Sequence, residues 1–183
     1  KIKLFDDNFL DEDHSGPICF TQDGKKAIYS KVSHRKQKLF GAHLVRPQLY
    51  ETNLVDGKWS EMEKLSFVKE SKTYGHPSIS GDGKTLYYVS DEFGGKGGKD
   101  LFVVNWENGE WSEPVALNIL NSIGDELFPS IQGDKLYFSS NGLGGEGGLD
   151  LFVSELKDGN WTVPVNLGST INSTFDDFGI VLN

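Results

Sequence analysis

Short runs of β-branched and aromatic residues alternate with polar turn residues along almost the whole chain. No segment repeats its apolar positions with the helical period of about 3.6 residues. One representative stretch contains four such runs, at 76–80, 85–90, 100–106 and 110–117. Each run is close to the length of an average strand, about 5–6 residues. The pattern therefore predicts an all-β protein.

Turn dipeptides join these runs in pairs. Asp-Gly lies at 82–83 between the first two runs, and Asn-Gly lies at 108–109 between the last two. Both dipeptides tolerate the positive φ that tight hairpins require, so antiparallel hairpins are predicted. The runs at 85–90 and 100–106 are apolar at successive positions. We therefore expect both faces of their sheet to be covered by neighbouring sheets.

The same pattern recurs about every fifty residues. Trp59, Trp111 and Trp161 stand in related segments and lie 52 and 50 residues apart. A second motif spans 75–90, returns at 127–140 and appears in degraded form at 16–30. Four short antiparallel strands per repeat of this length are typical of a β-propeller blade.

These repeats define the expected organisation of residues 1–183, a partial β-propeller of four-stranded antiparallel blades. Residues 1–15 are expected to hold the tail of a preceding blade and a loop, and residues 177–183 the first strand of a further blade. Whole blades are expected at 16–66, 75–118 and 127–168. Because propellers close with about 4–8 blades, the sequence predicts an open arc of about three blades with partial blades at both ends. We expect the chain to be a segment of a longer polypeptide.

Two glycine-rich stretches, "FGGKGGKDLFVV" from Phe93 and "LGGEGGLDLFVS" from Leu143, need an explanation. A phosphate-binding loop would lead into a helix, whereas Asp100 is followed by a predicted strand. A calcium turn remains an alternative, although such turns stack every nine residues or so and these copies lie fifty apart. The favoured interpretation is a structural joint in which Asp100 and Asp150 accept hydrogen bonds from loop amides.

Composition narrows the range of functions. The formal net charge of −9 argues against nucleic acid as a partner. No apolar stretch approaches the roughly 20 residues that span a bilayer, so direct membrane insertion is not expected. Cys19 is the single cysteine, and its apolar surroundings predict a buried structural thiol.

The search for catalytic chemistry gives structural interpretations. The four histidines and Cys19 lack metal-type spacing, and His76 is expected to be half-buried where later units carry Phe. Acidic clusters at 5–13, 124–126 and 175–179 recur at equivalent positions, which favours caps at strand ends over paired catalytic acids. Trp106 is expected to pack rather than bind sugar. We therefore predict no catalytic, cofactor-binding or metal-binding residue.

One feature does not repeat. Nineteen residues separate Ser30 from Leu49, against eleven in each of the next two units, counted from Ser90 and Ser140. The span 25–50 holds seven of the eighteen basic residues and no Asp or Glu. Because loops tolerate insertions at little cost, a solvated loop is one interpretation. The other is a partner contact, and the residues predicted for it are His34, Arg35, Lys36, Lys38 and Arg46.

The motifs "GHPSISGDGKTLYYVSDEFGGKGGKDLFV", "NGEWSEPVALN" and "GDELFPSI" resemble the WD40-like periplasmic propeller repeats related to TolB. More narrowly, they resemble repeats of multidomain proteins that carry an OmpA-like peptidoglycan-binding domain, some of which belong to the type IX secretion machinery. The resemblance implies a periplasmic, outer-membrane-associated scaffold without catalysis that has protein partners in an envelope complex. Peptidoglycan contact is implied only through an OmpA-like domain, which these residues do not include. The first unit departs from the pattern, since its glycine loop is replaced.

Three functions are therefore considered. The first is a non-enzymatic scaffold for protein–protein interaction in a bacterial cell envelope. The second is an accessory propeller of a peptidase or glycosidase, and the third is a carbohydrate-binding propeller. Kelch-type repeats are the alternative at the level of the fold.

Overall fold

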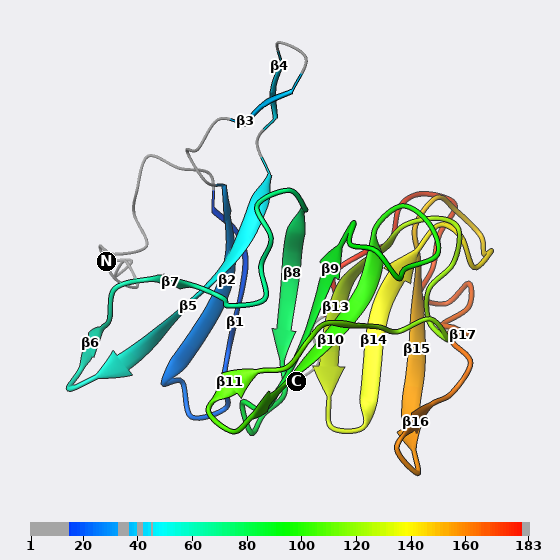
Figure 1. Cartoon of the computed structure of the whole chain (residues 1–183). Coiled ribbons are helices and arrows are strands. Elements are labelled where there is room, and N and C mark those ends of the chain that lie inside the picture. Colours follow the sequence, from blue (N-terminus) through cyan, green and yellow to red (C-terminus); the bar gives the residue numbers. More distant parts are fainter. Residues whose placement is uncertain (1–14, 33–36, 40–41, 45, 181–183) are drawn as a thin grey trace, which may run out of the picture.

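The computed structural model describes residues 15–32, 37–39, 42–44 and 46–180. Over these residues it consists of strands and turns without helix, as the sequence predicts. Figure 1 shows three antiparallel sheets side by side in chain order, with the first and last at opposite ends of an open arc. The prediction of an open arc of antiparallel blades is confirmed.

The strands of the three sheets follow one plan, in which the first four strands of each sheet pair in chain order and the fifth, short strand pairs with the third. The first sheet contains β1 (Ser15–Phe20), β2 (Lys26–Val32), β5 (Pro47–Val55), β6 (Lys58–Trp59) and β7 (Glu63–Lys64). The second contains β8 (Tyr74–Ile79), β9 (Thr85–Ser90), β10 (Asp100–Glu107), β11 (Glu110–Trp111) and β12 (Val115–Ala116). The third contains β13 (Glu126–Gln132), β14 (Lys135–Ser140), β15 (Asp150–Lys157), β16 (Asn160–Trp161) and β17 (Val165–Asn166).

The outermost strand of each sheet is broken into two short pieces, where the sequence predicted one run. In the second sheet both β11 and β12 pair with β10. Between them, the Ser112 hydroxyl accepts a hydrogen bond from the Asn105 amide at 3.0 Å, and the Ser112 amide donates to the Asn105 carbonyl at 2.8 Å. Pro114 follows and has no N–H to donate. A side chain therefore replaces part of the backbone ladder.

The turns follow the predicted dipeptides in two different ways. At the outer hairpins both residues have positive φ, as for Asn108 (54°) and Gly109 (89°). At the inner hairpin of the second sheet only Gly83 does, at 73°. There the Gly83 amide donates to the Ser80 carbonyl at 2.9 Å, and Asp82 accepts from the Lys84 amide at 3.0 Å. This inner hairpin is a longer, side-chain-capped loop rather than a two-residue turn.

The core lies between the sheets. One cluster joins Ile28 and Leu49 of the first sheet to Tyr88 and Phe102 of the second. Another joins the opposite face of the second sheet to residues of the third that include Phe138. Both faces of the middle sheet are thus buried, as its continuous apolar runs predict.

One region differs from the predicted plan, and another lies almost wholly outside the described residues. Phe178 and the residues up to Ile180 form no strand, although an inner strand was predicted there. A strand needs a hydrogen-bonded neighbour, and among the described residues no strand follows β17 to pair with this segment. Residues 1–15, predicted to complete a preceding blade, lie outside the described residues except for Ser15 in β1.

The insertion in the first unit contains a small hairpin that the sequence did not predict. Its strands are β3 (Gln37–Leu39) and β4 (Ala42–Leu44), which pair with each other and with no other sheet. Figure 1 shows this hairpin beyond the ends of β2 and β5. Strand pairing also corrects the length of the insertion, which the sequence spacing gives as eight residues, nineteen minus eleven. Leu49 lies opposite Ser30 and Leu101 opposite Val89, a separation of 19 against 12 residues, so the insertion adds seven residues rather than eight.

Candidate functional site

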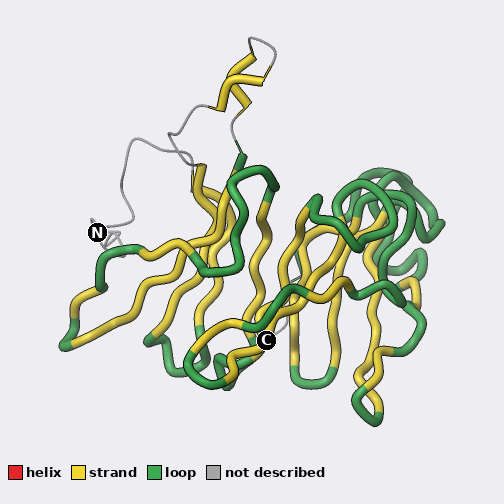
Figure 2. Tube along the Cα trace, viewed as in Figure 1, coloured by secondary structure: helices red, strands yellow, loops and turns green. Residues whose placement is uncertain are grey.

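One end of the sheets gathers the loops that the sequence analysis singled out. We call it the loop face and define it by the glycine loops, 93–99 and 143–149, and the loops that follow the last strand of the second and third sheets, 118–125 and 167–176. These loops are the green tubes above the second and third sheets in Figure 2. Asp125 accepts a hydrogen bond from the Lys99 amide at 2.8 Å, and Asp176 accepts one from the Leu149 amide at 2.9 Å. The first glycine loop is thereby attached to the loop that leads into the third sheet, and the second to the segment that follows the third sheet.

The glycines are required by this close approach. A Cβ atom on Gly97 would lie 2.4 Å from the carbonyl carbon and oxygen of Ile123. A Cβ atom on Gly147 would lie 2.0 Å from the Phe175 carbonyl oxygen. Contacts this short cannot be accommodated unless the backbone moves. The glycine run is therefore a joint between sheets.

The predicted role of the loop aspartates is confirmed. Asp100 accepts hydrogen bonds from the amides of Lys96 at 2.9 Å and Gly97 at 3.3 Å. Asp150 accepts the equivalent bonds in the third sheet, from Glu146 at 2.6 Å and Gly147 at 3.1 Å. Both carboxylates are buried and organise the backbone of their own loop.

The acidic clusters that can be described also cap backbone and hydroxyl groups, as predicted. Glu126 is fully buried and accepts hydrogen bonds from the hydroxyls of Ser122 at 2.5 Å and Ser140 at 2.7 Å. Asp177 accepts one from the Ser173 amide at 2.6 Å. The cluster at 5–13 lies outside the described residues. No three His, Cys, Asp or Glu side chains within 15–32 and 46–180 are placed to hold a metal ion together.

Apolar side chains project from these fixed loops. Phe93 is 92% exposed, Ile123 87% and Phe175 77%. The Lys72 ammonium lies 4.3 Å from the centre of the Phe93 ring. All three lie on the loop face, which makes this end of the sheets the candidate interaction surface.

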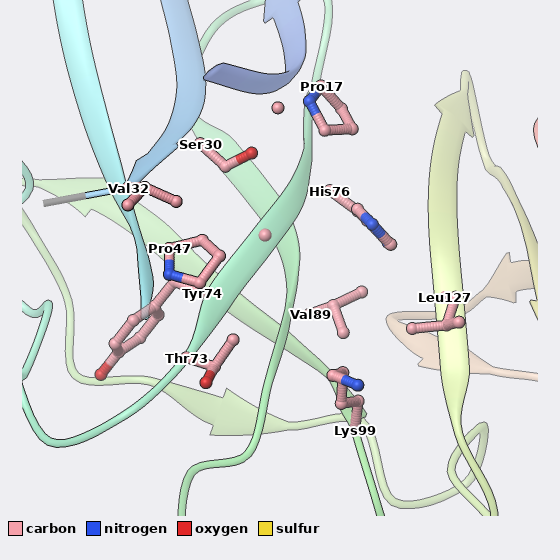
Figure 3. Close-up of a pocket in the computed structure, with 12 residues that line it drawn as sticks. Pro17, Ser30, Val32, Pro47, Thr73, Tyr74, His76, Val89, Lys99 and Leu127 are labelled. Carbon is pink, nitrogen blue, oxygen red and sulfur yellow. The ribbon is translucent and has the colours of Figure 1, made fainter. Parts of the chain in front are cut away.

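A cavity of about 340 Å³, which we call the inner cleft, opens beside these loops at the inner edge of the sheets (Figure 3). Its apolar lining is Val32, Pro47, Tyr74, Val89 and Leu127, together with Gly16, Pro17 and Gly75. Its polar lining is Ser30, Thr73, His76 and Lys99. None of these described lining residues is acidic.

The inner cleft adjoins the basic insertion. Val32 and Pro47 pair with each other where β2 ends and β5 begins, so the insertion leaves and re-enters the fold at the wall of the cleft. The guanidinium of Arg46, one of the residues predicted to contact a partner, donates to the Ser71 carbonyl. Lys38 lies in β3, and its side chain is outside the described part of the structure. His34, Arg35 and Lys36 are also outside it.

His76 joins the second sheet to the third. Its Nδ1 accepts a hydrogen bond from the Phe128 amide at 3.1 Å, and the two rings stack with centres 4.0 Å apart. An imidazole that accepts through Nδ1 and is neutral carries its hydrogen on Nε2. Burial, helped by the Lys99 charge, lowers the pKa of His76 to about 4. The ring is half-buried, as predicted.

Backbone geometry at His76 could not be read from the sequence. His76 has φ of 48° and Phe128 has φ of 53°, and a register shift between β8 and β9 occurs beside His76. Bulky residues rarely adopt this conformation. Each ring thus comes from an irregularity in its strand, one in β8 and one in β13, and the two rings stack on each other.

Two further predictions concern the rest of the first two sheets. Trp106 packs edge-on against Trp111, with ring centres 5.2 Å apart, and the Lys26 ammonium lies 4.7 Å above its ring. This is the packing role expected of it. The Cys19 thiol packs against the core, as predicted, and burial raises its pKa to about 12. The residue as a whole is partly buried, because neighbouring residues of β1 are exposed.

Several residues of the inner cleft were missed by the sequence analysis. Ser30 and Val32 stand at the end of an ordinary strand pattern, and Lys99 appeared only as part of the glycine loop. The available signal was the departure of the first unit from the repeat. That signal pointed to the insertion but not to the cavity at its base.

Comparison with known proteins shows the fold. No protein-family profile and no curated protein matches the sequence. Among solved structures, putative TolB from Agrobacterium tumefaciens matches with a TM-score of 0.56 and 16% identity, over 92% of this chain and 55% of that one. TolB from Acinetobacter baumannii matches with a TM-score of 0.50 and 19% identity, over 81% of this chain and 32% of that one.

A puromycin-hydrolysing peptidase of Mycobacterium tuberculosis matches as well, with a TM-score of 0.55 and 18% identity, over 85% of this chain and 23% of that one. The chain thus spans between about a quarter and just over half of the proteins it resembles. Within the described residues there is no helix of the length and apolarity that crossing a bilayer requires. The chain is an open arc of β-propeller blades with a TolB-like fold.

Proposed function

We propose that this arc is a non-enzymatic scaffold that binds a partner protein through its loop face. The observation that carries the proposal is the presentation of Phe93, Ile123 and Phe175 on loops that hydrogen bonds fix to one another. Groups held in place before binding lose less conformational entropy when a partner covers them. This favours recognition of another macromolecular surface.

The basic insertion is proposed as a second part of the same contact, through His34, Arg35, Lys36, Lys38 and Arg46. In a protein of net charge −9 it forms a local reversal of sign, which would attract an acidic partner and orient it. The proposed setting is a periplasmic, outer-membrane-associated assembly, such as the type IX secretion machinery. Support comes from the repeat motifs and the TolB-like fold. Peptidoglycan contact would need a further domain.

Site-specific photocrosslinking in the full-length protein, expressed in its own cells, tests this proposal. A photoreactive phenylalanine analogue replaces Phe93 or Phe175, and a matched control places it at Val55, which is also exposed but lies at the far end of β5. We expect a discrete protein adduct from the loop-face positions only. Reversing the charges of Arg35, Lys36 and Lys38 should weaken it. Equal adducts from all three positions, or none, would contradict the proposal.

An accessory propeller of a hydrolase is the second candidate, because the matched peptidase shares the fold. This candidate predicts that full-length protein has peptidase activity assigned to another domain. It also predicts that loop-face substitutions change substrate selection rather than the crosslinked partner. Measuring hydrolysis of a peptide library by wild type and by Phe93→Ser would separate the two functions.

A further inference from the structure

A stack of aromatic rings crosses the inner edges of the sheets and ends at the inner cleft. Phe178 stacks on Phe128 with ring centres 5.1 Å apart, and Phe128 stacks on His76 at 4.0 Å. His76 and Phe128 each precede a proline, and the residue that precedes the matching proline in the first sheet is Gly16. Within the described residues, no ring therefore covers the second face of His76.

The space at this end of the stack is defined by small residues. Gly16 lines the inner cleft together with His76 and Ser30. A Cβ atom on Gly16 would lie 2.2 Å from the Ser30 hydroxyl oxygen, so no side chain fits at this position while Ser30 keeps its place. In Figure 3, Ser30 and His76 lie on opposite sides of the open region, with Val32, Pro47 and Tyr74 along the side next to the first sheet.

The polar groups of the inner cleft are mainly donors. The Nε2–H group of His76 has no hydrogen-bond partner among the described residues, and Lys99 forms no ion pair with any of them. Ser30 is 3% exposed, and its hydroxyl makes no hydrogen bond to a described residue. Asp91, on a neighbouring segment, is engaged by the Thr73 amide at 2.7 Å. A ligand with an acceptor and a negative charge would complement these groups.

Resting on the proposed protein-binding function, we propose that the inner cleft binds the C-terminal aromatic residue of a partner polypeptide. Its ring extends the stack by lying on the free face of His76. Its carboxylate faces Lys99 and the His76 Nε2–H group, and its backbone bonds to Ser30. The aliphatic and proline side chains next to the first sheet contact the preceding residue of the partner.

Size and charge favour this occupant. A volume of about 340 Å³ is at the lower end of the range of ligand sites, about 300–1,000 Å³, which suits one or two residues rather than a long segment. The same chain already binds a carboxylate with serine hydroxyls, because Glu126 accepts from Ser122 and Ser140. At neutral pH the imidazole of His76 is uncharged and stacks as an aromatic ring, since its pKa is about 4.

The binding experiment uses full-length protein and fluorescein-labelled hexapeptides of sequence Gly-Ser-Gly-Ser-Ala-Phe. Fluorescence anisotropy compares the free acid, the C-terminal amide and a free acid that ends in Ala, and competition with N-acetylphenylalanine is measured separately. We expect the Phe free acid to bind at least tenfold more tightly than the amide and than the Ala peptide. Equal binding of acid and amide, or no saturable binding at millimolar peptide, would overturn the proposal.

Variants assign the contacts. Lys99→Gln should weaken binding of the free acid at least tenfold and leave binding of the amide unchanged. The control is Lys84→Gln, because Lys84 is exposed in an inner hairpin turn at the other end of the sheets, and it should change the binding of neither peptide. His76→Leu should weaken both peptides, and His76→Phe should restore the preference for Phe over Ala because it restores a ring. Melting temperatures check that each variant is folded. If Lys84→Gln is as damaging as Lys99→Gln, the site assignment is wrong.

The outcomes also separate this inference from the proposed function. Loop-face crosslinks at Phe93 report on partner binding without requiring the inner cleft. If those crosslinks form while no peptide binds, the inference fails and the proposed function stands. If N-acetylphenylalanine competes as strongly as the peptide binds, the occupant is a small aromatic acid, and the assignment to a chain end is overturned.

Discussion

Substitution of Gly97 by alanine tests whether the glycine loop is a joint between sheets. The added Cβ atom would lie 2.4 Å from the Ile123 carbonyl group, where an ordinary contact needs about 3.4 Å or more. The loop and the following sheet must therefore separate by about 1 Å, or the contact must be relieved by local strain. The backbone on both sides is fixed, so neither route is free of cost.

The size of the effect follows from the bonds at the joint. Separation would weaken the bond from the Gly98 amide to the Gly124 carbonyl at 3.0 Å and the bond from the Lys99 amide to Asp125 at 2.8 Å. Together these contribute about 2–4 kcal/mol. Overpacking without separation costs about 1–3 kcal/mol. The protein adopts the cheaper route, and alanine recovers about 0.4–1 kcal/mol by restricting the unfolded chain. The free energy of unfolding should fall by about 1–2 kcal/mol.

Urea denaturation followed by tryptophan fluorescence measures this change. Gly147→Ala should behave in the same way, since its Cβ atom would approach the Phe175 carbonyl oxygen to 2.0 Å. Gly75→Ala is the matched control, because a Cβ atom there meets nothing within 4 Å and its φ is not positive. The control should be neutral or slightly stabilising. Gly97→Ala and Gly75→Ala with the same unfolding free energy would refute the explanation of the glycine run.

Other parts of the structure support further predictions. Asp100→Asn should lower the unfolding free energy by about 1–3 kcal/mol, because the Lys96 and Gly97 amides bond to different carboxylate oxygens and asparagine keeps only one of these acceptors; added calcium should leave the wild-type melting temperature unchanged. Asn121→Ala should cost about 2–3 kcal/mol in the same urea assay, since it leaves the buried amide and carbonyl of Leu101 without their side-chain partners. The pKa of His76 is lowered from 6.5 in the unfolded chain to about 4 in the folded protein. The neutral imidazole therefore contributes fully to the free energy of unfolding above pH 6.5, and this contribution is lost as the pH falls toward 4. Half-burial limits that loss to about 1–2 kcal/mol, and the pH dependence of unfolding should be weaker by this amount in His76→Phe; an identical pH profile would contradict it.

Local patterns predicted the features that depend on local chemistry. Asn108 and Gly109 adopt the positive φ that their dipeptide suggests, and Asp100 bonds the amides of its own loop. Local sequence patterns did not predict the features that depend on a neighbouring sheet. The sequence shows that Gly97 is permissive, but only the fold shows that the Ile123 backbone fills the space beside it.

The bulge at His76 is a stronger example of the same limit. Phenylalanine is a poor candidate for positive φ, so local propensity argues against the observed backbone at Phe128. The hydrogen bond from the Phe128 amide to His76 and the stacked rings compensate for this conformation, and both partners come from different sheets. Tertiary contacts decide the geometry, and a single sequence does not contain their register.

The first unit differs from the others at the positions that make the joint. Strand pairing places Gln48 where the next sheets have Asp100 and Asp150, each opposite the matching residue of the preceding strand. Gln48 is buried, donates to the Lys72 carbonyl at 2.8 Å, and leaves its carbonyl oxygen without a partner in the described structure. An aspartate is needed there only when a glycine loop must be bonded. The insertion replaces that loop, so the first unit does not need an aspartate at this position. The inner cleft therefore lies at the place where the first unit lacks the glycine loop and the aspartate that bonds its amides.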